Sequence, residues 1–301
     1  MDPSAEVPTL SWAKAPSKPK KKIFYLFSEK VGTSLTPTTI QSGFVAKHLD
    51  HDLKTLETAD AETVPDILRD AGVNGGIIES HFGLDIMEEV EYVSDEAEQI
   101  GAVTVITKDE FGDLHGDNTN WKAVHRLLIE NKASEEGNLA LILGMDNFAT
   151  AAACALQHLG VPTVIWDPED TGRTAIACST FGCESASDAT KLDLSLFTIL
   201  VTAHAAFPLP EASLHSRLLI IDPVYDSERP LASLAATHNI RYVSGLEVQF
   251  LSNLLAFQAF VSPIGLPTAV EAPKKDMAKA ILDVLPEKMK ATPPEFLLKS
   301  L

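Results

Sequence analysis

The chain alternates between short runs of β-forming residues and longer segments whose apolar residues recur at helical spacing. Runs of the first kind predict strands, and segments of the second kind predict amphipathic helices. We predict strands at residues 23–27, 54–57, 75–78, 103–107, 139–143, 161–166, 197–201, 218–221 and 241–243. We predict helices at residues 37–49, 64–71, 84–92, 94–100, 118–128, 146–159, 173–181, 246–261 and 276–285. This alternation of strand and helix favours an α/β fold with a parallel sheet.

Capping residues mark the start of two of these helices. Thr36 is predicted as an N-cap, with Pro37 at the first helical position, which is a favoured arrangement. Asp146 follows a turn at Gly144 and is predicted as the N-cap of the next helix. With its flanking strands at 139–143 and 161–166, that helix forms a βαβ unit of the kind found in dinucleotide-binding folds.

Residues 103–128 are predicted to be the hinge between two α/β halves. A strand leads into a hairpin punctuated by Gly112 and Gly116, and glycine is a strong signal for such turns. Either Asn118 or Thr119 then opens a helix. The polar residues that follow the hairpin form the most informative polar cluster of the sequence.

Composition limits the partners of the chain. Its 301 residues suffice for two domains. A formal net charge of −18 disfavours contact with nucleic-acid phosphates, so any effect on gene expression is expected to pass through another protein. No apolar run reaches the roughly 20 residues of a membrane helix, so no membrane partner is expected.

The location of the protein is predicted from its N-terminus and its cysteines. Residues 1–22 are predicted to be a disordered tail, and they end in the lysine-rich run 18–22. Such a run is equally compatible with a nuclear localisation signal and with a solvated flank. The start of the chain has no signal-peptide pattern, and three cysteines at unremarkable spacing favour reduced thiols inside a cell. We therefore expect a cytoplasmic or nuclear protein, or both.

The order of several motifs resembles that of shikimate dehydrogenases from about residue 24 to residue 262. The matching stretches are Ser34-Leu35-Thr36-Pro37, Leu84-Asp85-Ile86-Met87, Gly116-Asp117-Asn118-Thr119, Asp222-Pro223-Val224-Tyr225 and Gly245-Leu246-Glu247. The amino-acid sequence of these stretches is most similar to the dehydrogenase-like domain of the fungal pentafunctional arom polypeptide and of its relative, the fungal quinate repressor. The resemblance implies a two-domain shikimate dehydrogenase-like architecture. Residues 23–117 with about 246–290 would form an N-terminal α/β substrate-binding domain, residues 118–245 a Rossmann-like nucleotide-binding-type domain, and a C-terminal helix would return to the first domain.

The resemblance also locates the two residues that would transfer protons. Shikimate dehydrogenases use a lysine and an aspartate, and the matching positions here hold Gly83 and Asn120. Glycine has no proton to exchange, and an amide does not titrate at useful pH. The resemblance therefore implies that no catalytic residue is left at these positions. His81, two residues before Gly83, titrates in the right range and is the alternative proton-transfer group.

The cofactor loop departs from the family pattern as well. Dinucleotide sites need glycines so that the backbone can approach the pyrophosphate, but here Gly144 is followed by Met145, Asp146, Asn147 and Phe148. Asp146 places a carboxylate at a helix N-terminus, where a phosphate would otherwise bind. We expect no cofactor and no metal. The alternative is that Asp167, after the next strand, binds the ribose of NAD.

The pocket for a small molecule keeps part of its polar lining by the same resemblance. Ser34, Thr36, Asn118 and Tyr225 retain hydrogen-bonding groups at family positions, whereas Glu79, Thr104 and Ser252 depart from the family. Glu79 would repel a carboxylate ligand. The four retained residues are equally compatible with purely structural roles in loops and caps.

Three hypotheses for function follow. The first is a catalytically inactive regulatory module resembling the quinate repressor, which represses transcription of quinate catabolism by binding a transcriptional activator protein and senses a quinate- or shikimate-type molecule. The second is a divergent but active shikimate or quinate dehydrogenase that depends on NADP or NAD and uses His81. The third is a structural or assembly domain without a small ligand.

Overall fold

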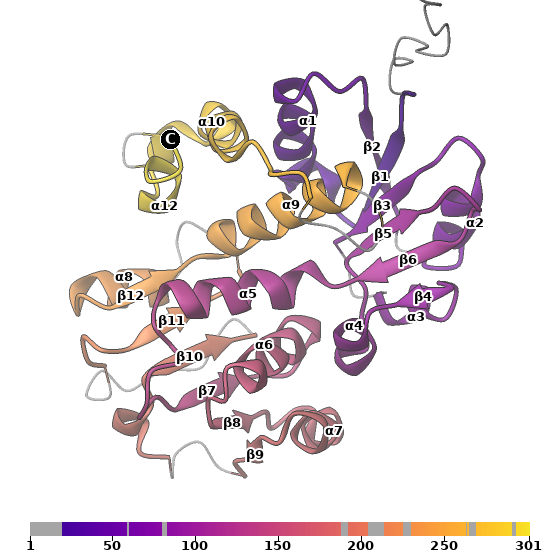
Figure 1. Cartoon of the computed structure of the whole chain (residues 1–301). Coiled ribbons are helices and arrows are strands. Elements are labelled where there is room, and N and C mark those ends of the chain that lie inside the picture. Colours follow the sequence, from indigo (N-terminus) through magenta and orange to yellow (C-terminus); the bar gives the residue numbers. More distant parts are fainter. Residues whose placement is uncertain are drawn as a thin grey trace, which may run out of the picture.

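The computed structural model describes residues 20–58, 60–79, 83–187, 192–203, 214–224, 230–262, 264, 269–290 and 293–301. Its strands form two six-stranded sheets, the first at the upper right and the second at the lower left of Figure 1. The first sheet is built from residues 23–117 and the second from residues 140–243. The division into domains at residues 117 and 245 stays a prediction.

The first sheet is mixed rather than parallel. Its order is β2-β1-β3-β5-β6-β4, with bounds β1 Ile23–Ser28, β2 Asp52–Glu57, β3 Gly75–Ile78, β4 Tyr92–Val93, β5 Val105–Lys108 and β6 Leu114–Asp117. β1 runs parallel to β2 and β3, but β5 is antiparallel to both β3 and β6. The β5–β6 hairpin reverses the chain here, and Gly112 in its turn adopts φ +96°. The hairpin is confirmed, and the expectation of a parallel sheet is wrong for this half.

The helices of this half are short. They are η1 Val31–Thr33, α1 Thr36–Ala46, α2 Thr63–Arg69, α3 Gly83–Met87 and α4 Asp95–Ile100. The helix predicted at residues 84–92 is wrong beyond Met87, because Tyr92 and Val93 pair with His115 and Gly116 of β6. Strand pairing with a distant segment overrides the local helical pattern.

The second sheet is parallel throughout its described pairs. Its order is β12-β11-β10-β7-β8-β9, with bounds β7 Ala140–Leu143, β8 Thr163–Trp166, β9 Glu184–Ser185, β10 Ile199–Thr202, β11 Leu219–Ile221 and β12 Arg241–Val243. The connecting segments include α6 Asn147–His158, α7 Thr171–Phe181, η3 Leu194–Leu196 and α8 Pro230–Thr237. The predicted α/β, Rossmann-like architecture is confirmed by this sheet.

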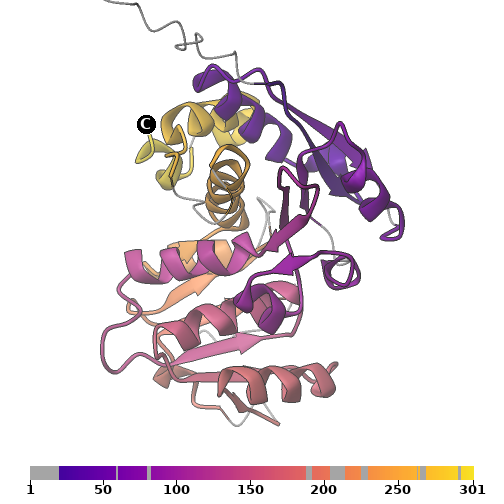
Figure 2. The same cartoon turned by 45° about the vertical axis from the view of Figure 1, so that its right-hand side comes forward.

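Two long helices join the halves. α5 Thr119–Glu130 packs against α6 and α9, and α9 Gly245–Val261 packs against α5 and α1. In Figure 2, α9 lies between the two sheets, beside α1 and the C-terminal helices. Those helices are α10 Lys274–Val284, α11 Glu287–Lys290 and α12 Glu295–Leu298. One cluster of buried apolar side chains extends from β1 through α9 to the second sheet, so α9 returns to the first half as expected.

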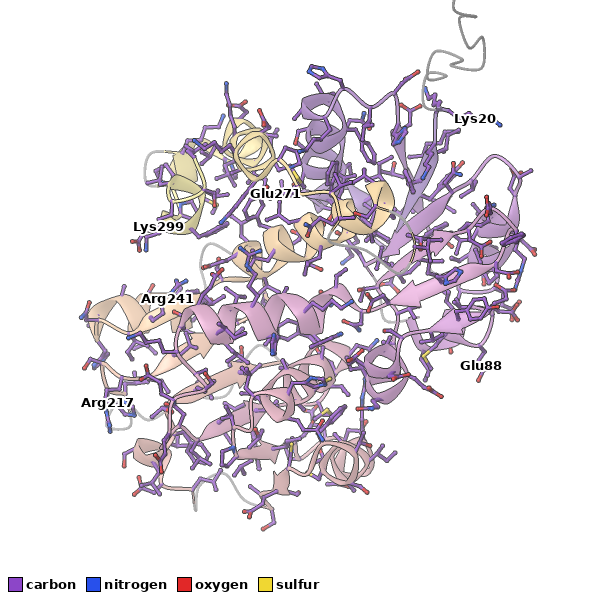
Figure 3. All side chains as sticks on the ribbon, viewed as in Figure 1. Lys20, Glu88, Arg217, Arg241, Glu271 and Lys299 are labelled. Carbon is purple, nitrogen blue, oxygen red and sulfur yellow. The ribbon has the colours of Figure 1, made fainter. Side chains whose placement is uncertain are left out.

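An ion pair between the exposed Arg241 and the buried Glu247 links the start of α9 to β12. Arg241, labelled in Figure 3, donates from Nη2 to Glu247 Oε1 at 2.7 Å and from Nε to Asn131 Oδ1 at 3.2 Å. Glu247 is 6% exposed. Burial raises the pKa of Glu247, and the neighbouring Arg241 opposes that rise. Removing Arg241 would leave the buried charge of Glu247 uncompensated.

Acidification is expected to destabilise the fold through a histidine cluster on α5 and α6. His125 lies beside Trp121 and 6.3 Å, between ring centroids, from His158. Burial, and then the charge of His158, lower the pKa of His125. The unfolded chain therefore binds a proton more readily, and the contribution of neutral His125 to stability is lost as the pH falls below about 6.5. Melting temperatures measured from pH 7.5 to 5.5 should fall, and should fall less in the His125→Gln variant. An equal fall in both proteins would contradict this prediction.

Candidate functional site

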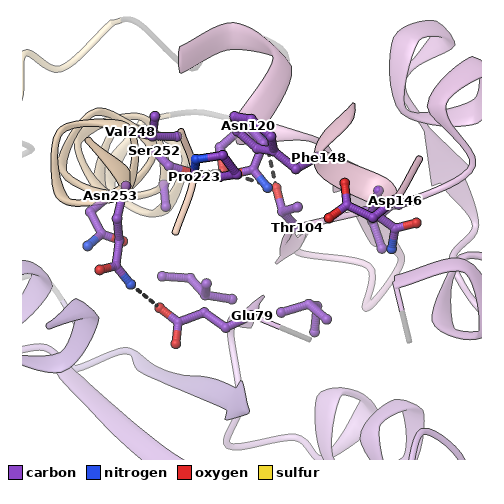
Figure 4. A pocket seen from close by; sticks show the side chains of 18 of the residues that line it. Glu79, Thr104, Asn120, Asp146, Phe148, Pro223, Val248, Ser252 and Asn253 are labelled. Atoms are coloured by element: carbon purple, nitrogen blue, oxygen red, sulfur yellow. Dashed lines mark hydrogen bonds between the residues drawn. The ribbon is translucent and has the colours of Figure 1, made fainter. Parts of the chain in front are cut away.

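A cleft of about 480 Å³ lies between the two halves, and α9 forms one wall of it. Side chains from both halves line it (Figure 4). Those that carry polar groups are Glu79, Thr104, Thr119, Asn120, Asp146, Asn147, Arg173, Gln249, Ser252 and Asn253. Figure 4 places Glu79 and Asp146 in different parts of the cleft.

Glu79 accepts hydrogen bonds from Ser34 and Thr36, two of the residues predicted to contact a ligand. It directly follows β3, and its Oε1 accepts hydrogen bonds from Ser34 Oγ at 2.9 Å, from Thr36 Oγ1, and from Gln249 Nε2 at 3.0 Å. The structure therefore brings Ser34 and Thr36 together at one carboxylate oxygen, while their predicted role in ligand binding stays a prediction. Their hydroxyl groups are directed at a carboxylate of the chain itself.

The predicted capping role of Thr36 is wrong. Leu35 occupies the N-cap position of α1 and its side chain makes no capping bond. Thr36 is instead the first helical residue, and its backbone N–H donates to Ser34 Oγ at 3.1 Å. Its side chain is fully buried and turns to Glu79, because a charged acceptor forms a stronger hydrogen bond than a neutral backbone group.

Asn118 serves the backbone rather than the cleft. It is the N-cap of α5 and accepts hydrogen bonds from the N–H groups of Asn120 and Trp121 at 3.0 and 3.2 Å. Its Nδ2 donates to Ala102 O at 2.9 Å, and the residue is 1% exposed. The structure thus places Asn118 in the structural role that the sequence left open beside the ligand-binding role. Tyr225 and His81 lie outside the described residues.

The two positions that resemble the proton-transfer pair have different surroundings. Gly83 is the first residue of α3 and is buried. A Cβ atom there would lie 2.7 Å from Val103 O, so any side chain would require a shift of the backbone. Asn120 lines the cleft, where its Oδ1 accepts a hydrogen bond from Ser252 Oγ at 3.1 Å.

A chain of hydroxyl groups leads to Asn120. Thr104 Oγ1 lies 3.0 Å from Thr119 Oγ1, which lies 2.6 Å from Ser252 Oγ. Ser252 then donates to Asn120. None of these four side chains is a base near neutral pH. The row of hydroxyl groups can therefore orient a ligand hydroxyl, but none of its members can accept the proton of that hydroxyl.

The loop between β7 and α6 is filled by its own side chains. Gly144 adopts φ +88°, and Asp146 caps α6 by accepting from the N–H of Ala149 at 2.8 Å. The capping prediction for Asp146 is confirmed. Asn147 Oδ1 accepts a hydrogen bond from Arg173 Nη2, and Phe148 is 9% exposed while lining the cleft. A phosphate at this helix N-terminus would meet the carboxylate of Asp146, which already binds there.

Arg173, like Gln249 and Asn253 of α9, lines the cleft without having been predicted from the sequence. It lies in the first turn of α7, where Asp170 caps the helix by accepting from its N–H at 2.8 Å. An arginine in the first turn of the helix after the second strand of a βαβ unit was the available signal. Asp167, in contrast, accepts hydrogen bonds from the N–H groups of Glu169 and Asp170 at 2.7 and 3.1 Å, so it holds this turn.

Other classes of site have little support. Burial raises the pKa of the Cys154 and Cys183 thiols to about 12, which leaves them poor nucleophiles. Among the described residues, no group of three or more His, Cys, Asp or Glu side chains could hold a metal ion. Within the same residues, every helix is too short or too polar to cross a membrane.

Comparisons with known proteins agree with this geometry. No model of a protein family matches the chain. It is 27% identical, over 271 residues, to a pentafunctional AROM polypeptide of Schizosaccharomyces japonicus, which covers 80% of this chain but 17% of that polypeptide. The shikimate dehydrogenase of Aquifex aeolicus has a TM-score of 0.77 and 17% identity, covering 87% of this chain and 97% of its own. A quinate dehydrogenase from Corynebacterium glutamicum, solved with NAD, has a TM-score of 0.77 and 19% identity over 88% of this chain and all of its own.

The predicted fold is confirmed by these likenesses. The chain has a shikimate dehydrogenase-like fold and is homologous to the dehydrogenase part of fungal AROM polypeptides. It spans about one sixth of the length of the AROM polypeptide of S. japonicus. The link to the quinate repressor stays a prediction.

Proposed function

We propose that this AROM-related chain with a shikimate dehydrogenase-like fold is a catalytically inactive regulatory module that acts by binding another protein. One observation carries the proposal. The positions that resemble the catalytic lysine and aspartate hold Gly83 and Asn120, and the backbone at Gly83 leaves no room for a side chain, since Val103 O would lie 2.7 Å from its Cβ.

The cofactor loop supports the same proposal. The residues present do not fit a dinucleotide, because the carboxylate of Asp146 caps the helix that would bind the pyrophosphate. Asp167 uses Oδ1 to hold its own turn. A chain without the lysine and aspartate of the family pair and without an open phosphate loop would keep the fold and the cleft but lose hydride transfer.

The partner is proposed from charge and resemblance. A net charge of −18 opposes binding to nucleic-acid phosphates, so a role in gene expression would pass through a protein. By resemblance to the quinate repressor, we propose that this protein is a transcriptional activator of quinate catabolism, which the module binds in the cytoplasm or the nucleus. A small polyhydroxylated molecule in the cleft would control the contact. Deleting the gene should raise transcripts of quinate catabolism without added quinate, and unchanged transcripts would contradict the repressor role.

The alternative is a divergent active dehydrogenase. The preserved cleft of about 480 Å³ and its hydroxyl chain favour it. One assay separates the two functions: purified protein is mixed with quinate or shikimate and with NAD or NADP, and reduced cofactor is followed by absorbance. We expect no rate above the background without protein. A rate that is clearly above background and proportional to protein concentration would establish the alternative.

A further inference from the structure

Three hydrogen-bond donors converge on one oxygen of Glu79. Ser34 Oγ and Gln249 Nε2 donate at 2.9 and 3.0 Å, and the Thr36 hydroxyl donates to the same atom. The donors come from the loop before α1, from the start of α1 and from α9, so only the folded chain assembles them. Hydrogen bonds to an ionised carboxylate are among the strongest that neutral donors make. This set of donors, the cradle, has the chemistry of a carboxylate-binding site.

The amide of Asn253 borders the cradle. Asn253 lies one helical turn after Gln249 on α9, lines the cleft and is 3% exposed. Its Oδ1 is 3.1 Å from Thr36 Oγ1. Within the described part of the chain, its Nδ2 has no hydrogen-bond partner. Because Thr36 has a single hydroxyl proton, which it gives to Glu79, its contact with Asn253 is also satisfied with the amide oxygen and nitrogen exchanged. Asn253 is therefore an adjustable polar group beside the cradle.

We propose that Glu79 is an internal ligand: its carboxylate fills the cradle, so the native cleft takes a neutral polyhydroxylated molecule and excludes carboxylates. This inference rests on the proposed function, because it names the ligand class of the same cleft. An incoming carboxylate would compete with Glu79 for the same donors and would be repelled by its charge.

The rest of the cleft wall matches a neutral polyol. Thr104, Ser252 and Asn120 offer hydroxyl and amide groups, which donate to and accept from ligand hydroxyls. Arg173 is the cleft cation among the described residues, and it already donates to Asn147 beside the carboxylate of Asp146.

The test is chemical rescue of Glu79→Ala. This variant removes the internal carboxylate but keeps its donors, so its melting temperature should fall. Sodium acetate should then restore at least half of that loss relative to sodium chloride at equal concentration, because a ligand of the native state raises its stability. Acetamide, which is neutral, should not. Glu98→Ala, which removes an exposed carboxylate on α4, is the matched control and should show no acetate response, like the native chain. Equal responses to acetate and chloride in Glu79→Ala would overturn the proposal.

A second comparison covers the case in which Glu79→Ala does not fold. Glu79→Gln keeps an acceptor oxygen, and Ser34→Ala removes one donor. If the cradle holds Glu79 as proposed, the two substitutions together should lower the melting temperature by less than the sum of their separate effects, since both break the same interaction. Additive losses would overturn the proposal.

Ligand binding separates this inference from the proposed function. Quinate and shikimate should raise the melting temperature of Glu79→Ala and leave that of the native chain unchanged. Equal stabilisation of both proteins would overturn the role of Glu79. Formation of reduced cofactor by the native chain would instead contradict the proposed function, while the acetate experiment would still decide whether the cradle exists.

Discussion

Replacing Gly245 by alanine should lower the melting temperature by roughly 6–12 °C. A Cβ atom at this first residue of α9 would lie 2.2 Å from Pro223 O and 2.6 Å from Pro223 C. Backbone atoms cannot move aside as a flexible side chain does, so the clash displaces the start of α9. Overpacking of this kind costs about 3 kcal/mol, and each kcal/mol lowers the melting temperature of a chain of this size by about 2–4 °C.

Gly172 offers the matched control. It lies in the first turn of α7, where a Cβ would meet only Asp170 Oδ1, at the ordinary contact distance of 3.7 Å. Alanine favours a helix over glycine by up to about 1 kcal/mol, so Gly172→Ala should melt at or slightly above the native temperature. A difference of about 1 °C or less between the two variants would be negligible on the scale above. It would contradict the prediction that a Cβ atom at Gly245 clashes with Pro223.

The second large effect concerns an attempt to restore catalysis. The double variant Gly83→Lys with Asn120→Asp recreates the residue types of the proton-transfer pair, yet we expect it to remain without turnover. The new side chain at position 83 must displace Val103 O, which lies 2.7 Å from its Cβ position. That displacement should destabilise the fold by about 1–3 kcal/mol, and the cofactor loop would still carry Asp146.

The single variant Asn120→Asp separates the effect of the clash at position 83 from that of the closed cofactor loop. Ser252 donates to Oδ1 of Asn120 at 3.1 Å, and an aspartate keeps that acceptor, so this variant should melt close to the native chain. Both variants are assayed for reduced cofactor with quinate and shikimate. Turnover by the double variant at native-like stability would show that two side chains account for the whole loss of activity, and the proposed closure of the cofactor loop would be wrong.

Local signals in the sequence predicted the parts of the fold that depend on local physics. The turn at Gly112 needs φ +96°, and Asn118 and Asp146 cap their helices through neighbouring N–H groups. Such features lie within a few residues of the signal. The central strands β7, β10 and β11 were predictable for a similar reason, since strands buried on both faces are continuously apolar. The exposed edge strand β9 has no such run and was not predicted.

The remaining features depend on partners that are distant in the sequence. Thr36 was predicted as a cap, but Glu79, which is 43 residues away, takes its hydroxyl. The helix predicted through Tyr92 gives way to pairing with β6. The resemblance identified Glu79 as unfavourable for a carboxylate ligand, but only the folded chain shows that its carboxylate occupies the donors. Arg173 reaches Asn147 from another helix, and no local pattern indicates that contact.

The most direct test of the central claim is a calorimetric titration of the native chain with NADP and with NAD. The claim is that the fold is kept while the chemistry is lost, and cofactor binding can be measured without knowing the substrate. Asp146 caps the helix that would bind a pyrophosphate, and Arg173 donates a hydrogen bond to Asn147. We predict no saturable heat for either cofactor up to millimolar concentration. Micromolar affinity for either one, about −8 kcal/mol of binding free energy, would contradict the account.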